Sequence, residues 1–200
     1  MSFQKPPTVS DDYRAVDIYR QAAGVISQRG FDATSMGDIA NEVDLTKGGL
    51  YYYIKGKKAL LFAIMDFAMN RLEAEVLEPA RKEEDPEQRL VILIAGHVSL
   101  VIEDIDAMTV TVTEEEGLEE KHREQIRQRK RIYNDFLRDT IMAVLDAHDR
   151  IDALDPAIAA YGVMGMVHWV VRWYRKDGPL SEEAVTDQIT RLILYGMLPE

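Results

Sequence analysis

The sequence predicts an all-α fold of about nine helices, with a three-helix head at the N-terminus and a larger helical body behind it. Three observations support this fold class. Apolar residues recur at helical spacing along nearly the whole chain. No segment alternates apolar and polar residues between hairpin turns, as a half-buried strand would. The 12 glycines and 7 prolines fall largely between the periodic segments, where they separate one helix from the next.

The chain opens with a segment that shows no helical pattern. Residues 1–10 contain two prolines and no apolar periodicity, which predicts a flexible arm. A first helix is expected over residues 11–29, and Gly30 suits its C-terminal stop. Its apolar stripe consists of Ala15, Tyr19, Ala22, Ala23 and Ile26.

Two short helices come next, and each has a capping signal. Ser35 and Asp38 have the spacing of a capping box, which predicts a helix that ends near Val43. Thr46 can cap another helix, which ends near Ile54. The remaining helices are expected over 57–82 (with a late kink at Pro79), 86–105, part of 106–118, 119–149, 156–176 after the cap pair Asp155-Pro156, and 181–198.

Charge divides the chain into two parts. The net charge is −11, but residues 1–58 hold 8 basic and 7 acidic residues, a net of +1, whereas residues 59–200 hold 16 and 28, a net of −12. This asymmetry predicts different partners for the two parts and leaves a phosphate-binding head possible. With 46% apolar residues, no cysteine and an apolar run of only 13 residues at 90–102, we expect a cytoplasmic protein without disulfides or a membrane span.

Residues 35–54 are typical of a helix-turn-helix. Ile39, Ala40 and Val43 form the inward face of the first short helix. Leu45, Leu50 and Ile54 form that of the second. Between the helices, Asp44 is one of the few non-glycine residue types that adopts left-handed backbone geometry readily.

The second short helix has the composition of a phosphate-binding element. Its first turn contains Thr46, Lys47, Gly48 and Gly49, with no carboxylate and little bulk, so backbone N–H groups can approach a phosphate. The tyrosines and lysines that follow it are also groups that contact phosphates, and core tyrosines with solvated lysines are the alternative that this pattern favours less. They are Tyr51, Tyr52, Tyr53, Lys55, Lys57 and Lys58.

Residues 11–61 resemble the DNA-binding head of the TetR family of bacterial transcriptional repressors. The match runs from Thr34 and Ile39-Ala40 through the 46–60 segment, TKGGLYYYIKGKKAL. Asp44 replaces the usual glycine of the turn, Tyr53 a common histidine and Ile54 a common phenylalanine. The resemblance implies a DNA-binding domain over 11–56 and an effector-binding and dimerisation domain over 57–200.

The resemblance also implies how the head meets double-stranded DNA. It places Lys47, Gly48 and Gly49 against the major groove, and Lys47 can reach guanine O6 and N7. The backbone-phosphate contacts that it implies are Thr46, Tyr51, Tyr53 and Lys57. A homodimer would then span a palindromic operator.

In this family the body forms the dimer. Small residues near Gly162 and Gly165 allow two helices to approach closely, and the last helix could complete a four-helix interface. Packing within one chain is the alternative. The predicted interface residues are Gly162, Gly165, Met166, Ile189 and Ile193.

The body also binds a small effector in this family. Residues 168–178 resemble TetR-family regulators of fatty-acid or sterol breakdown that respond to acyl-CoA thioesters, and Arg172 or Arg175 would bind the anionic group beside Trp169. Core aromatics with cations at a helix C-terminus are the plainer interpretation. A long-chain acyl-CoA or similar hydrophobic, anionic lipid is favoured as effector. The pocket would be lined from Phe62, Met65, Met69, His97, Val101, Ile105, Met108, Tyr133, Phe136, Leu137 and Met164.

Several alternatives stay open. A regulator of drug efflux would bind a cation through Glu103 or Asp104. The basic run over 121–131 is either a solvated, ion-paired face or a patch for nucleotide phosphates. The four histidines lie on different segments without paired ligand spacing, so we expect no metal, no cofactor and no enzyme activity. An all-helical enzyme or scaffold is the alternative outside this class.

Overall fold

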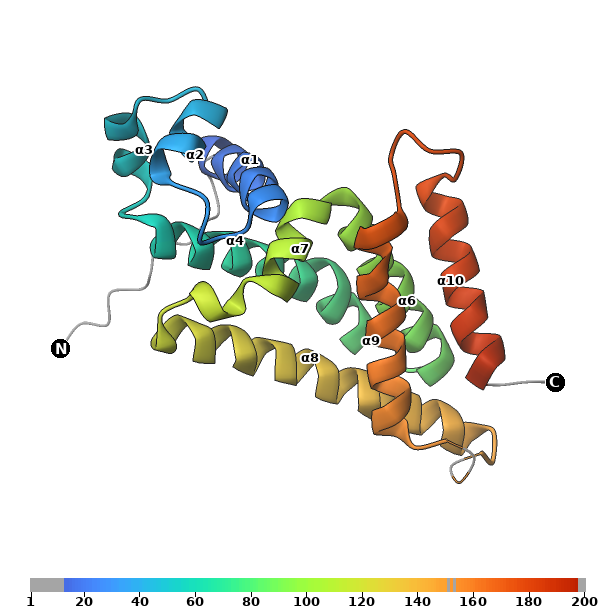
Figure 1. Cartoon of the computed structure of the whole chain (residues 1–200). Helices are drawn as coiled ribbons and strands as arrows, with labels where there is room; N and C mark the ends of the chain where they lie inside the picture. The colour runs from blue at the N-terminus through green and yellow to red at the C-terminus, as the bar shows by residue number, and fades with distance from the viewer. Residues whose placement is uncertain (1–12, 151, 153, 198–200) are drawn as a thin grey trace. The chain divides into compact units, whose positions relative to one another are not determined.

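The computed structural model describes residues 13–150, 152 and 154–197, and it confirms the all-α fold class. No strand occurs within these ranges, and nine helices are present if the continuous helical stretch 57–81 counts as one (Figure 1). The predicted arm over 1–10 lies outside the described residues. The α-helices are α1 (Tyr13–Arg29), α2 (Met36–Glu42), α3 (Lys47–Tyr53), α4 (Lys57–Arg71), α5 (Glu78–Arg81), α6 (Pro86–Glu103), α7 (Ile105–Thr113), α8 (Glu120–Ala147), α9 (Pro156–Trp173) and α10 (Glu182–Met197).

The chain forms two compact units. Of the described residues, the first comprises 13–68 together with 106–123, and the second comprises 69–105, 124–150, 152 and 154–197. The head expected over 11–56 lies inside the first unit, which also takes in most of α4 and all but the first residue of α7. These added segments belong with the head because they pack into it. Gly117, for example, lies against the rings and methyl groups of Phe31 and Leu61.

Local capping chemistry sets the helix boundaries where the sequence predicts them. The Ser35 hydroxyl accepts the N–H of Asp38 at 3.1 Å, and the Asp38 carboxylate accepts the Ser35 N–H at 2.8 Å, which completes the capping box of α2. The Ser35 hydroxyl also donates to the Asp38 carboxylate, and this bond, followed by the one from the Ser35 N–H, lowers the pKa of Asp38. The Asp155 carboxylate caps α9 by accepting the N–H groups of Ala157 and Ile158, ahead of Pro156. However, α9 ends at Trp173, three residues earlier than predicted, because Tyr174 is extended.

The helical stretch 57–81 differs most from its prediction. We expected one helix with a kink at Pro79, but a π-helix over Leu72–Leu77 separates α4 from α5, and the Glu78 N–H bonds to the carbonyl of Glu73. Pro79 has no N–H and its ring crowds the carbonyl of the preceding turn. A shift to i→i+5 bonding in that turn lets the helix continue past the proline.

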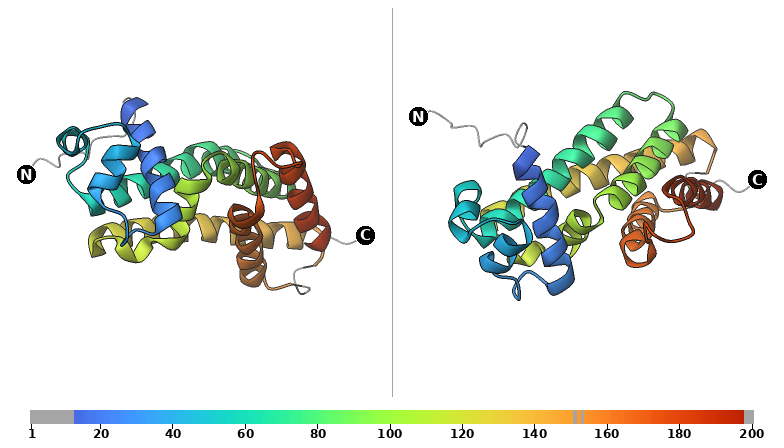
Figure 2. Two further views of the ribbon diagram at one scale, coloured as in Figure 1. Left: turned by 45° about the horizontal axis from the view of Figure 1, so that its top comes forward. Right: turned by 90° about the horizontal axis from the view of Figure 1, so that it is seen from above.

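In the second unit, α6 lies at the centre. It packs against α9, against α10 and against the π-helix (Figures 1 and 2). A Cβ added at Gly96 would lie 3.2 Å from Val76, so glycine permits the close approach of α6 to the π-helix. Leu90, Leu93 and Ile94 of α6 are fully buried.

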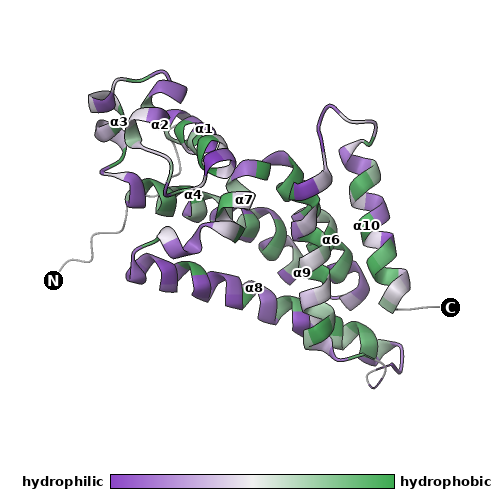
Figure 3. Ribbon diagram, in the orientation of Figure 1, coloured by the Kyte–Doolittle hydropathy of each residue, from purple (hydrophilic) through white to green (hydrophobic). Residues whose placement is uncertain are grey.

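Hydropathy changes along α8, from mostly polar in its first half to mostly apolar near its end (Figure 3). Within the described ranges, no helix is long and apolar enough to span a bilayer.

Candidate nucleic-acid interface and candidate ligand pocket

The segment from α2 to α3 forms a helix-turn-helix. At the turn, Asp44 has φ of 52°, so the predicted left-handed residue is confirmed. The Leu45 N–H bonds to the Ala40 carbonyl at 2.9 Å, and Arg14 of α1 donates to the Val43 carbonyl at 2.8 Å. With the fully buried Leu50 facing inward, these bonds fix α3 against the rest of the head.

The first turn of α3 is open to solvent and has little side-chain bulk. Thr46 is the N-cap, and its hydroxyl accepts the Gly49 N–H at 3.0 Å. Lys47 and Gly48 are exposed. A Cβ at Gly49 would lie only 3.2 Å from the Thr46 hydroxyl, so this glycine also makes room for the cap. The turn therefore presents backbone and one lysine, as the sequence predicts.

The three tyrosines of α3 differ in exposure. Tyr51 is exposed, and Tyr53 is half-buried with its ring edge-to-face on Tyr52 at 5.4 Å. Tyr52 is 85% exposed, although the resemblance did not mark it as a contact residue. An exposed phenol on the recognition helix is available to a phosphate, so Tyr52 joins the candidate contacts.

Lys57 has a structural role that sequence reasoning missed. Its ammonium donates to the carbonyls of Phe31 and Asp32 at 2.8 and 3.3 Å and lies 4.3 Å from the centre of the Phe31 ring. These contacts tie the start of α4 to the turn after α1. The neighbouring lysines, Lys55 and Lys58, are exposed.

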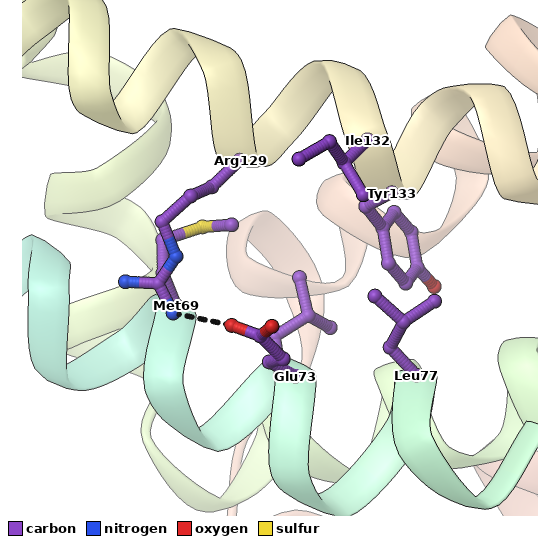
Figure 4. A pocket seen from close by; sticks show the side chains of 7 residues that line it. Met69, Glu73, Leu77, Arg129, Ile132 and Tyr133 are labelled. Carbon is purple, nitrogen blue, oxygen red and sulfur yellow. Dashed lines mark hydrogen bonds and ion pairs between the residues drawn. The ribbon is translucent and has the colours of Figure 1, made fainter. Parts of the chain in front are cut away.

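A small pocket in the second unit lies between the π-helix and α8 (Figure 4). Its cavity volume is about 30 Å³, room for about two water molecules. The wall is mostly apolar, with one arginine and one glutamate among the lining residues. These are Met69, Leu72, Glu73, Leu77, Arg129, Ile132 and Tyr133. An apolar cleft with a few polar groups is the usual form of a small-molecule site.

Arg129 supplies the positive charge of this pocket. Its guanidinium donates to the Glu73 carboxylate at 3.0 Å and to the Asn70 side-chain oxygen at 2.8 Å. The sequence pointed to the basic run over 121–131 but not to this arginine. Arg123, in the same run, pairs with Glu116 at 3.0 Å in the first unit, so much of the run is ion-paired.

Behind the pocket wall lies a buried polar cluster. Tyr133 closes the pocket, and its hydroxyl is 3.0 Å from Nδ1 of buried His97. The His168 ring lies edge-to-face on His97, with 5.4 Å between centroids. Burial lowers the pKa of His97 well below its ordinary value, with a further contribution from His168. Burial, helped by the charge of Lys130, lowers the pKa of His168 to about 4. Both imidazoles are therefore neutral at pH 7.

The structure brings together two of the residues that the sequence proposed for the pocket, Met69 and Tyr133, with His97 one hydrogen bond behind them. The others lie elsewhere because they serve as core or surface. Phe62 stacks on His122 at 4.0 Å in the first unit, where Met65 and Met108 are buried. In the second unit, Val101 and Leu137 are buried, whereas Ile105, Phe136 and Met164 are half-buried. None of these five residues lines the pocket.

The residues predicted for an anion site near the end of α9 lie at the surface. Arg172 is exposed, and exposed Arg175 pairs with Asp177 at 3.2 Å. Trp169 is 63% exposed on the helix surface. Because α9 ends at Trp173, Arg175 follows the helix instead of extending it.

The carboxylates of the efflux-type alternative are already paired. Arg71, only 15% exposed, donates to Glu75 and Glu103 at 2.6 Å each and also to Asp104. This set of carboxylates, Glu75 first, raises the pKa of Arg71. A cationic ligand would have to displace an arginine held by three acids, so this cluster does not favour that alternative.

One face of α9 and α10 carries exposed apolar residues. The stripe on α9 includes Gly162, Gly165 and Met166 of the predicted dimer interface, and a Cβ at either glycine would meet open space. On α10, Ile193 is 3% exposed and belongs to the protomer interior, and Ile189 is half-buried; Leu192, at 64%, faces outward instead. The exposed members are Ile158, Tyr161, Met166, Trp169, Trp173, Leu192 and Tyr195.

A helix-turn-helix head together with a helical body that contains a small apolar pocket is the architecture of a DNA-binding regulator. Residues 18–64 match the family model described as "Bacterial regulatory proteins, tetR family", and residues 83–197 match "Tetracyclin repressor-like, C-terminal domain". The chain belongs to the TetR family, and it is a TetR-type transcriptional repressor. The resemblance of residues 11–61 to this family is therefore confirmed. Members of the family are regulatory proteins.

Known proteins share the fold over most of the chain. The crystal structure of AibR in complex with isovaleryl coenzyme A and operator DNA is 32% identical, covers 90% of this chain and 97% of its own, and has a TM-score of 0.78. The HTH-type transcriptional repressor KstR2 of Mycolicibacterium smegmatis is 27% identical over 92% of this chain and 90% of its own. The fatty acid metabolism regulator protein of Bacillus subtilis is 21% identical over 91% and 94%.

Proposed function

We propose that this repressor binds a palindromic operator as a homodimer and is released by a short-chain acyl-CoA or a similar anionic acyl compound. The observation that carries the proposal is the apolar pocket between the π-helix and α8, with Arg129 at its wall. The apolar lining suits an acyl chain, and the arginine suits a phosphate or carboxylate. The proposal includes no cofactor and no catalytic step, and it places the repressor with its operator in the cytoplasm.

The pocket would have to widen to admit an effector. Its cavity volume is about 30 Å³, whereas drug-sized ligands occupy roughly 300–1,000 Å³, so an acyl chain would enter only by displacing side chains and the nucleotide part would remain outside. The sequence favours a long-chain acyl-CoA, but a short acyl group requires the smaller displacement. The AibR structure, which contains isovaleryl coenzyme A, supports an effector of this class.

The proposed DNA contacts are those of the exposed α3 surface. Lys47, Gly48 and Gly49 would face the major groove, while Thr46, Tyr51 and Tyr53 would contact phosphates, together with Tyr52. Lys57 remains a proposed phosphate contact through its third ammonium hydrogen, since two of its donors serve the carbonyls after α1. Operator affinity should fall steeply with salt, which would distinguish a DNA-binding protein from an enzyme or scaffold.

Lys47→Ala is expected to relax sequence preference at one base pair in each half-site. Lys47 is the one long side chain in the open first turn of α3, and loss of a good base contact costs about 1–3 kcal/mol of discrimination. The measurement compares binding to an operator selected from a random duplex library with binding to its single-base variants. Lys58→Ala is the control, because an exposed lysine outside α3 should weaken all sequences alike. Equal losses on all duplexes for Lys47→Ala would assign it to phosphate.

The exposed stripe on α9 and α10 is the proposed dimer surface. Large aromatic and aliphatic side chains flank glycines whose Cα atoms are uncovered, so two helices can pack closely there. Gly162, Gly165 and Met166 remain in the proposed interface, with Ile189 at its edge and Leu192 and Tyr195 added. Effector binding would then alter the distance between the two heads, provided that the effector prefers one of the two states.

The test of effector class is operator release in a gel-shift titration. Acyl-CoAs of graded chain length are compared with free fatty acids, coenzyme A and cationic dyes. We expect release by short acyl-CoAs, and loss of that release in Arg129→Gln with DNA binding intact. Arg175→Gln is the matched control, since its side chain is exposed and pairs only with its neighbour Asp177 among the contacts described. Release by dyes and indifference to all acyl-CoAs would support an efflux-type regulator instead.

A further inference from the structure

An ion pair connects the two walls of the pocket. Glu73 lies on the π-helix and Arg129 on α8, and their side chains meet at 3.0 Å (Figure 4). Arg129 is 22% exposed and Glu73 is 51% exposed, so the arginine is the more enclosed partner and the glutamate lies at the rim. Both residues line the pocket itself. The site therefore contains its own carboxylate, held on the cation that an anionic ligand would need.

Residue spacing explains why this carboxylate faces the pocket. Met69, Glu73 and Leu77 follow one another four positions apart, and residues at that spacing lie on one face of a helix. The i→i+5 bonding over Leu72–Leu77 brings Leu72, five residues before Leu77, nearer to the same face. Glu75, on the same π-helix, pairs instead with Arg71.

We propose that Glu73 is a built-in competitor of the effector, occupying Arg129 in the ligand-free state. This inference rests on the proposed function, in which the effector carries an anionic group. That group replaces the Glu73 carboxylate on the guanidinium and forms charge-assisted hydrogen bonds in its place. Glu73 then returns to solvent at modest cost, because it is already half exposed.

The exchange also gives the two states different contacts. Without effector, the Glu73–Arg129 pair links the π-helix to α8. With effector bound, that link is broken and the ligand bridges the two walls. A ligand shifts an equilibrium only through such a difference between states. Glu73 is thus a positioning and competing residue, and it sets the effector concentration at which the repressor responds.

The experiment measures binding of isovaleryl-CoA by calorimetry to the full-length wild type, Glu73→Gln, Glu75→Gln and Arg129→Gln. Glu73→Gln keeps the size of the side chain but removes the competing charge. We expect this variant to bind isovaleryl-CoA two- to fivefold more tightly, because a partly exposed ion pair stabilises a protein only modestly. The gain should shrink at high salt. Glu75→Gln is the matched control, because it removes the same charge from the same π-helix but faces Arg71, and its affinity should stay within experimental error. Arg129→Gln should bind at least tenfold more weakly.

The outcomes separate the inference from the proposed function. If the wild type binds isovaleryl-CoA and Glu73→Gln binds it equally or more weakly, Glu73 is not a competitor, while the proposed function stands. If Glu73→Gln and Glu75→Gln both bind isovaleryl-CoA more tightly by the same factor, the gain comes from the lower overall negative charge of the protein, and the inference fails. If the wild type binds none of the graded acyl-CoAs, the proposed function fails and the inference falls with it. Circular dichroism of each variant checks that it is folded.

Discussion

Gly117→Ala is expected to destabilise the first unit by about 1–3 kcal/mol, the usual cost of overpacking a core. An added Cβ would lie 2.6 Å from Cδ1 of Phe31 and 2.9 Å from Cδ2 of Leu61. Both side chains are buried, at 4% and 0% exposure, so they can yield only by disturbing their own neighbours. The melting temperature should fall by several degrees, since about 1 kcal/mol shifts it by roughly 2–4 °C in a chain of this size.

Gly37→Ala is the control for this prediction. Gly37 lies within α2, and a Cβ there would meet only the Ser35 hydroxyl, at 3.5 Å. Alanine at that position should be neutral or slightly stabilising, because it favours the helix. Differential scanning calorimetry of the two variants beside the wild type makes the comparison. If Gly117→Ala has the same melting temperature as the wild type, the segment 114–118 does not pack on Phe31 as described.

Stability is expected to fall as the pH decreases from about 6.5 towards 4. The imidazoles of buried His97 and half-buried His168 have pKa values below that of an unfolded histidine, and that of His168 is about 4. Protonation therefore favours the unfolded chain, so their contribution is fully present above pH 6.5 and decreases below it. Each such group lowers the free energy of unfolding by about 1.4 kcal/mol per pH unit within that window.

A substitution isolates this effect from the titration of the many carboxylates. His168→Gln removes one of the two imidazoles, and the pH dependence of its unfolding free energy between pH 6.5 and 4.5 should be flatter than that of the wild type by about 1.4 kcal/mol per unit. His148→Gln is the control, because His148 is exposed and pairs with Glu87 at the surface. Denaturant unfolding at several pH values measures both. Parallel pH profiles for wild type and His168→Gln would contradict the prediction.

Local chemistry explains why the sequence predicted the helices and the head so well. Capping depends on residues three positions apart, so Ser35 with Asp38 and Thr46 with Gly49 act without help from distant parts of the chain. The left-handed turn at Asp44 and the exposed first turn of α3 are local in the same sense. The motif that these features form is long enough to identify the family.

The pocket could not be predicted in this way. Met and Leu residues on long helices face either a cavity or a core partner, and periodicity is the same for both. The list drawn from the sequence therefore mixed two pocket residues with core residues such as Met65 and Val101. Arg129 was missed because its role depends on a partner 56 positions earlier, Glu73. The π-helix was missed because Pro79 predicts a disturbance but not its form.

The fold class, the helix starts and the helix-turn-helix head follow from the sequence alone, because interactions within a few residues establish them. Tertiary packing turns Ile193 inward and Leu192 outward, leaves Arg172 and Arg175 at the surface, and brings Arg129 to the pocket wall. These outcomes depend on which helix faces cover one another. Neighbouring residues on one helix point about 100° apart, so a modest rotation of the helix changes which side chains lie in the core, at the surface or in the pocket.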